Sequence, residues 1–248
     1  MSRRRIMRVL FSSVMIIAAT VFGSVVCGAD GWYEPDAASA GVNDDCGMVS
    51  GIWGGVKVRG QFLTAKDSGV APELFERVNG GNEIETADNG RIEIVTGNNT
   101  VSLIGPNSKV KIVGVRLFTD GNGKSAMRLA IELQQGVVRV QVRLNAENPE
   151  SVSVDAGGVS ALVMRGDAVV SGGSDWKVSA LAGTALYRTA QGAPTHLTAS
   201  ETGSLNGGVT GLPNAEAAAL ATSLPFSFDI SRATLRPSPP PNPLLEAP

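Results

Sequence analysis

Few side chains in this sequence could act as catalytic bases, nucleophiles or metal ligands. His196 is the only histidine, and it follows a Pro-Thr turn at the start of a short apolar run. One histidine cannot supply a typical multi-histidine metal site. Cys46 has no supporting signature for a cysteine–histidine pair, the acidic residues beside it are too sparse for a metal site, and no Gly-x-Ser-x-Gly nucleophile elbow occurs. We therefore expect a non-enzymatic protein with no catalytic residue, no metal and no cofactor.

Three carboxylates have a spacing that could suit acid–base chemistry. Glycoside hydrolysis uses a pair of Asp or Glu side chains, and Glu83, Glu85 and Glu93 could approach one another on one face of a sheet. Alternate positions of a strand that faces water on one side are also where solvated acids belong. We expect these three glutamates to lie on a solvated face and to take no part in catalysis.

Arginine and tryptophan are the remaining candidates for a binding surface. Arg128, Arg139 and Arg143 occupy positions that would let them share a sheet face. Trp53 and Trp176 could anchor a ligand, but we expect both to fill the core. These patterns assign no residue to a binding site, so the binding residues stay unknown.

The elements that would position these residues are best defined in residues 80–113. Four short apolar runs occur there, and each of the first three ends at Gly, Asn, Asp or Pro. In residues 91–94 and 109–112 every second residue is apolar, which sends one face of a strand to a core and the other to water. The residues at the corners suit tight reversals. This stretch predicts four consecutive β-strands.

The same pattern continues through most of the chain. Alternating or apolar runs recur at residues 56–59, 126–133, 138–142, 151–154, 159–163, 168–170, 176–181, 184–187 and 196–198. About a dozen or more short strands separated by turns are typical of a sandwich, a barrel or a β-solenoid. The fold class is therefore all-β, with mostly antiparallel strands in a sandwich or a solenoid-like domain. Before the C-terminal tail, only residues 216–222 have a helical composition.

Residues 1–29 have the three parts of a secretory signal peptide. Four arginines between residues 3 and 8 precede an apolar run over residues 9–26, and small residues end at Ala29. We expect cleavage after Ala29, with an uncleaved signal anchor as the alternative because 18 apolar residues approach the length that spans a bilayer. The basic start also resembles a twin-arginine signal, and Cys27 could accept a lipid, but a merely basic signal peptide is favoured over both. The expected location is the periplasm or the cell envelope.

The rest of the chain divides into three parts. Residues 30–51 lack periodicity and predict an irregular leader, residues 52–206 hold the β-domain, and residues 207–248 form a C-terminal segment. That segment ends in a Pro-rich tail over residues 236–243, which cannot pair in a sheet because proline lacks an amide donor. We expect an extended, disordered spacer there, with a docking sequence as the alternative.

The motifs of the β-domain resemble those of the FecR domain family over residues 52–206. Residues 81–86 resemble the family's G-D-x-I-x-T opening, with Asn82 in place of Asp. Residues 133–138 match its L-x-x-G-x-V strand entry. Residues 161–167 resemble its A-x-V-x-G-T step, with Asp167 in place of Thr. Further matches lie at Leu103, Pro106, Ser108, Val110, residues 152–155 and residues 178–183.

The resemblance implies an all-β periplasmic part that acts by binding. FecR-type proteins connect an outer-membrane receptor to a cytoplasmic sigma factor, and a separate N-terminal domain binds the sigma factor. Only eight residues precede the apolar run here, so we expect a FecR-like domain without that sigma-regulating part.

The charge balance excludes one class of partner. Residues 1–29 hold four of the 21 basic residues and no acid, which leaves 17 basic and 23 acidic residues, a net charge of −6. A protein that binds nucleic acid needs clustered Lys and Arg, and no such cluster follows Arg8. The membrane would be contacted only through residues 9–26, if the signal stays uncleaved.

The sequence thus predicts an exported, non-enzymatic FecR-domain protein of the bacterial envelope that binds an envelope protein or a glycan. Binding would use a sheet face, an edge strand or the loop between Asp120 and Lys124. One alternative is a membrane-anchored signal transducer in a FecR-type sigma-factor pathway. The other is an envelope carbohydrate-binding or hydrolytic module.

Overall fold

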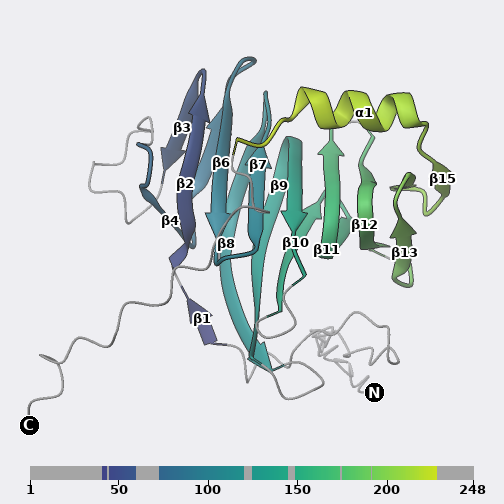
Figure 1. Cartoon of the computed structure of the whole chain (residues 1–248), viewed down its shortest axis with the longest axis horizontal. Coiled ribbons are helices and arrows are strands. Elements are labelled where there is room, and N and C mark those ends of the chain that lie inside the picture. Colours follow the sequence, from purple (N-terminus) through teal and green to yellow (C-terminus); the bar gives the residue numbers. More distant parts are fainter. Residues whose placement is uncertain are drawn as a thin grey trace, which may run out of the picture.

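The computed structural model describes residues 41–43, 45–59, 73–119, 125–144, 149–173, 175–190 and 192–227. These residues form a β-sandwich with one helix (Figure 1). Layer A contains β1 (Gly41–Asn43), β3 (Val56–Arg59), β5 (Glu83–Thr86), β8 (Lys109–Thr119), β10 (Glu150–Ala156) and β13 (Thr195–Thr198). Layer B contains β2 (Asp45–Trp53), β4 (Arg77–Asn79), β6 (Arg91–Thr96), β7 (Thr100–Ile104), β14 (Glu201–Ser204) and β15 (Val209–Gly211).

Three long strands belong to both layers: β9 (Ser125–Val142), β11 (Val159–Gly172) and β12 (Lys177–Thr189). The first half of β9 pairs with β8 and, in parallel, with β10, whereas the second half pairs with β7 and β11. Likewise, β12 pairs with β14 through its first half and with β13 through its second half. The sandwich is therefore one hydrogen-bonded sheet folded over on itself.

Glycines lie where these strands pass from one layer to the other. Gly136 in β9, Gly166 in β11 and Gly183 in β12 have φ values of 90°, 130° and 69°, which side chains disfavour. Gly166 and Gly183 are cross-strand partners. A Cβ atom at Gly166 would lie 2.1 Å from the carbonyl oxygen of Ala182. The crossing thus needs both the backbone conformation and the close approach that glycine permits.

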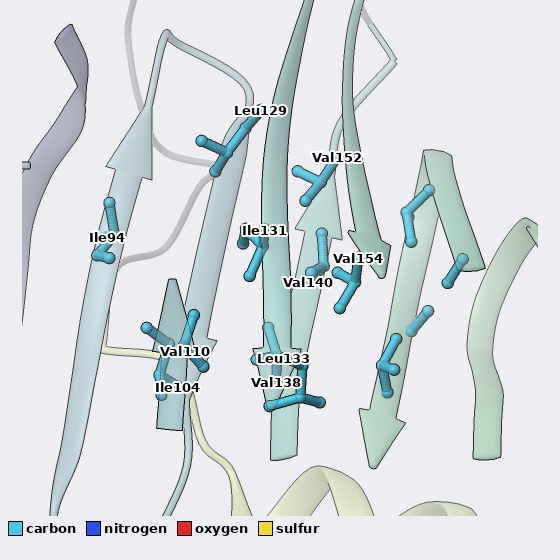
Figure 2. Close-up of a cluster of buried hydrophobic side chains, with 14 of the residues drawn as sticks. Ile94, Ile104, Val110, Leu129, Ile131, Leu133, Val138, Val140, Val152 and Val154 are labelled. Carbon is cyan, nitrogen blue, oxygen red and sulfur yellow. The ribbon is translucent and has the colours of Figure 1, made fainter. Parts of the chain in front are cut away.

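One apolar core fills the space between the layers. In β9, Ile131 and Leu133 reach it from layer A, and Val138 and Val140 reach it from layer B; Figure 2 shows these side chains gathered between the strands. All four are fully buried. Burial of each such side chain stabilises the fold by roughly 1.5–3 kcal/mol. The strict alternation of apolar residues is therefore what holds the two layers together.

The predicted all-β fold class is confirmed, but three pairs of predicted strands are single strands. Residues 126–133 and 138–142 are both in β9, residues 159–163 and 168–170 are both in β11, and most of residues 176–181 together with 184–187 are in β12. A glycine with positive φ bends a strand without ending its hydrogen bonding. In a sequence, such a bend resembles a turn.

The expected irregular leader is wrong for its second half. Within residues 30–51, β1 begins at Gly41 and β2 begins at Asp45. The register of β2 against its neighbours shifts between Asp45 and Gly47 and again between Val49 and Gly51. These irregularities interrupt the apolar alternation, which is why the sequence pattern did not indicate a strand.

The helix expected over residues 216–222 is confirmed as α1 (Asn214–Ser223), which lies across one end of the strands (Figure 1). Among the described residues, no helix is both long and apolar enough to span a bilayer. The expected signal peptide, the loop between Asp120 and Lys124 and the Pro-rich tail lie outside the described residues.

Candidate binding groove

The structure separates the residues that were weighed for nucleophilic chemistry. His196 is exposed on β13, at the edge of layer A. Cys46 lies on β2 of layer B and is 1% exposed within the core. Cys46 is thus a core thiol, because its side chain packs among apolar residues. In the part of the chain that the structure describes, no group of three His, Cys, Asp or Glu could hold a metal ion.

The three glutamates do not share a face. Glu83 and Glu85 lie on the outer face of layer A, where cross-strand partners give a ladder of alternating charge: Glu85 faces Lys57 on β3 and Lys109 on β8. The Glu85 carboxylate lies 3.5 Å from the Lys109 ammonium group. Glu93 lies on layer B and is 0% exposed. Glu83 and Glu85 therefore lie on a solvated face, as expected, and are half-buried there. The expectation of a solvated face is wrong for Glu93.

The three arginines do not share a face either. Arg128 lies in the half of β9 that belongs to layer A, and its Nε donates to Ser151 Oγ. Arg139 lies in the half that belongs to layer B, and Arg143 is exposed just after β9 ends. Strand β9 passes from layer A to layer B at Gly136, which lies between Arg128 and Arg139. The alternation of side chains along the strand therefore does not place these two arginines on one face.

Trp53 and Trp176 both pack against other side chains and are half-buried. Trp176 is half-buried against the core, and its indole ring fills the space that a Cβ atom at Gly157 or Gly172 would occupy, at 2.0 and 1.7 Å. Trp53 is also half-buried and packs on the outer side of layer B. Arg91 Cζ lies 5.4 Å from the centroid of the Trp53 ring.

A segment of the chain itself covers an apolar surface on the outer face of layer B. We call residues 224–227 the strap and the surface below them the strap groove. Leu224 is 3% exposed, and Phe226 is half-buried beside it. The apolar side chains that line the groove come from five strands: Trp53, Leu103, Val137, Val169 and Leu181.

A notch at Gly105 admits the first strap residue. A Cβ atom at Gly105 would lie 2.7 Å from Leu224 Cδ2 and 2.5 Å from Val137 Cγ1. Any larger residue would therefore displace the leucine or the groove wall. The absence of a side chain at Gly105 thus leaves room for the Leu224 side chain.

Arg139 fixes the end of the groove nearest α1. Its Nε donates to Asp167 Oδ1 at 2.9 Å and its Nη2 to Asp167 Oδ2 at 2.5 Å, a bidentate pair in which both residues are less than 9% exposed. Its Nη1 donates to the carbonyl oxygens of Ala221 at 2.9 Å and Leu224 at 2.6 Å. The last carbonyls of a helix lack partners within the helix and carry partial negative charge, so a cation is favourable there.

The aromatic side chain of the strap completes this contact. Arg139 Cζ lies 4.6 Å from the centroid of the Phe226 ring, a distance at which a cation is attracted to the ring face. Each of the three guanidinium nitrogens has an acceptor, and Asp167 balances the charge. This arrangement offsets much of the desolvation cost of a buried charge.

Glu93 fixes the other end of the strap. Its carboxylate accepts hydrogen bonds from the Ser227 amide at 2.7 Å and from Ser227 Oγ at 2.8 Å, and Ser50 Oγ donates to Glu93 Oε1 at 2.7 Å. The strap is thus held at one end by a guanidinium group that donates to its carbonyl groups and at the other by a carboxylate that accepts from its N–H and O–H groups. These two ends fix the direction in which a bound chain runs.

The helix before the strap contributes little to these contacts. No residue of α1 is buried, and no side chain caps its first turn. What ties this segment to the sheet lies at its C-terminal end, at Arg139 and in the strap. The groups that this surface contacts are a helix end, two apolar side chains and the N–H and O–H donors of one serine.

A family model described as FecR protein matches residues 82–186. Residues 82–186 thus match a FecR domain. The match covers 105 of the 248 residues and confirms the resemblance in the motifs. Most of the strap groove is built by this FecR domain, since β6, β7, β9, β11 and Leu181 lie within residues 82–186, whereas the strap lies beyond them.

Two crystal structures from Parabacteroides distasonis ATCC 8503, each described as that of a "putative anti-sigma factor", are similar to the chain. One has a TM-score of 0.38 and 15% identity and covers 52% of this chain and 57% of its own. The other has a TM-score of 0.42 and 12% identity and covers 56% of this chain and 63% of its own. The chain therefore spans less than two thirds of either protein. No curated protein matches the sequence.

Sequence reasoning missed the groove because its parts are distant in the chain. Glu93 and Ser227 are 134 positions apart, and Arg139 and Leu224 are 85 apart. The signals that could have found it are an apolar pair, Leu224 and Phe226, just after a short helix, and a bulky apolar residue at Leu103, which shares the groove face of layer B with Glu93.

Proposed function

We propose that the chain is an exported, non-enzymatic FecR-domain protein of the bacterial envelope that binds a protein partner. The observation that supports the proposal is the strap groove, a surface mostly within residues 82–186 that holds a segment of the chain itself by apolar packing and directional polar contacts. Export is supported by the basic and apolar parts of residues 1–29.

The proposal is tested by photo-crosslinking in cells. A photoreactive amino acid at Thr222 probes the exposed side of α1, and one at Gln134 probes the outer face of layer A; both positions are exposed. A discrete protein adduct that forms at either position in the periplasmic fraction supports the proposal. Adducts at neither position, together with sedimentation of the chain on purified cell wall, would overturn it in favour of a carbohydrate-binding module.

A second function is favoured by the FecR match. A membrane-anchored transducer in a FecR-type sigma-factor pathway would keep residues 1–29, whereas the exported form loses them. N-terminal sequencing of the chain from membrane and periplasmic fractions separates the two. A mature N-terminus at Asp30 supports export, and intact residues 1–29 in the membrane support the transducer.

A further inference from the structure

The strap joins the sheet through a small and local set of contacts. Its contacts are made within residues 224–227 and by the carbonyl oxygen of Ala221, to which Arg139 Nη1 donates. The helix that links it to the sheet buries no residue. Loss of the strap from the groove would therefore leave the core between the layers unchanged.

We infer that the strap groove accepts a segment of a partner polypeptide in place of the strap. This inference rests on the proposed function and names the chemistry of the partner. The segment ends a helix with free carbonyl groups and then supplies, in order, a branched apolar residue, an aromatic residue and a residue that donates through both N–H and O–H.

Charge complementarity supports this choice of occupant. The Arg139 guanidinium group faces the negative end of a helix dipole, and the Glu93 carboxylate faces two donors. A peptide without a helix end would leave Arg139 Nη1 without the carbonyl acceptors that Ala221 and Leu224 supply. Such a loss costs more than the contact contributes, because a buried polar group without a partner has lost its water as well.

Because the strap competes for the groove, it determines the affinity that a partner segment needs. A tethered segment is present at an effective concentration on the order of millimolar, so a free segment of equal quality cannot compete at micromolar concentration. A partner reaches the groove when it binds better than the strap or when the strap is weakened. The strap thus acts as a threshold for partner binding.

The test uses a fluorescent synthetic peptide of residues 214–227 and the full chain. In one variant, Leu224→Ala and Phe226→Ala weaken the strap without altering any groove residue. We expect this variant to bind the peptide at least tenfold more tightly than the unaltered chain, as measured by fluorescence anisotropy. A matched peptide with Phe226→Ala should bind the variant at least tenfold more weakly, because it lacks the ring that packs over Arg139.

Two results would overturn the inference. One is a variant that keeps its far-UV circular dichroism but binds the peptide no better than the unaltered chain. The other is equal binding of the two peptides. Because this test uses no cellular partner, it can succeed while the crosslinking experiment fails, and the reverse also holds. The two proposals are therefore distinguished.

Discussion

At the scale of single residues, two buried serines give opposite expectations. Ser102 is 0% exposed, and its hydroxyl group has no hydrogen-bond partner. Ser108 is 3% exposed, but its hydroxyl accepts from the Val137 amide at 2.9 Å. A buried hydroxyl group without a partner costs stability, whereas a paired one contributes about 0.5–1.5 kcal/mol.

We therefore expect Ser102→Ala to raise the free energy of unfolding by about 1 kcal/mol and Ser108→Ala to lower it by about 1–3 kcal/mol. Urea denaturation followed by far-UV circular dichroism measures both. A loss of stability in Ser102→Ala as large as in Ser108→Ala would contradict the assignment of Ser102 as unpaired.

Glu201 offers a residue-scale test by titration. Hydrogen bonds from the backbone amide of Thr198 and from its hydroxyl group lower the pKa of the Glu201 carboxyl group below its ordinary 4.5. Because the folded-state pKa is depressed, this stabilisation is present above pH 4.5 and is lost as the pH falls through the folded-state value.

Thr198→Val removes the hydroxyl donor and keeps the amide. We expect the pKa of Glu201 to rise part of the way toward its ordinary value, as measured by an NMR titration of the glutamate side chain. An unchanged Glu201 pKa would show that the hydroxyl group does not act on the carboxylate.

At the scale of elements, the bend of β9 at Gly136 can be tested against a glycine with the same conformation. Gly136 and Gly81 have φ values of 90° and 87°. A Cβ atom at Gly136 would lie 2.3 Å from Ser108 Oγ and 2.5 Å from its Cα, whereas a Cβ at Gly81 meets nothing within 4 Å. The two sites thus share the backbone strain and differ in space.

We expect Gly81→Ala to lower the free energy of unfolding by about 1–2 kcal/mol, the cost of a side chain in this backbone conformation. Gly136→Ala should cost more by about 1–3 kcal/mol, because the neighbouring strand must also move. Thermal or urea unfolding of the two variants gives the difference directly. If both variants lost the same free energy of unfolding, the strand crossing at Gly136 would have space for a Cβ atom.

The strands also show which parts of the fold could be predicted from the sequence. Apolar alternation in residues 91–94, 109–112 and 138–142 gave correct strands and correct core faces. It could not show that Gly136 bends a strand rather than ending it, because tight turns and bends both use glycine. It could not show that Glu93 is covered, because the covering residue, Ser227, comes from the far end of the described chain.

At the scale of the whole molecule, the shared strands bear on how the sandwich unfolds. Because β9, β11 and β12 each supply hydrogen bonds to both layers, neither layer can open while the other keeps its full set of strands. One core also joins them. We therefore expect the two layers to unfold together, in one transition.

Two tryptophans make this prediction measurable. Trp53 reports on the outer side of layer B, and Trp176 on the turn between β11 and β12. Single-tryptophan chains, made by replacing the other two of the three tryptophans with Phe, should give urea transitions with the same midpoint as their own far-UV circular dichroism, since coincident transitions mark two-state unfolding. A Trp53 transition that precedes the loss of circular dichroism would show instead that layer B opens by itself, and the folded-over sheet would then not be the cooperative unit.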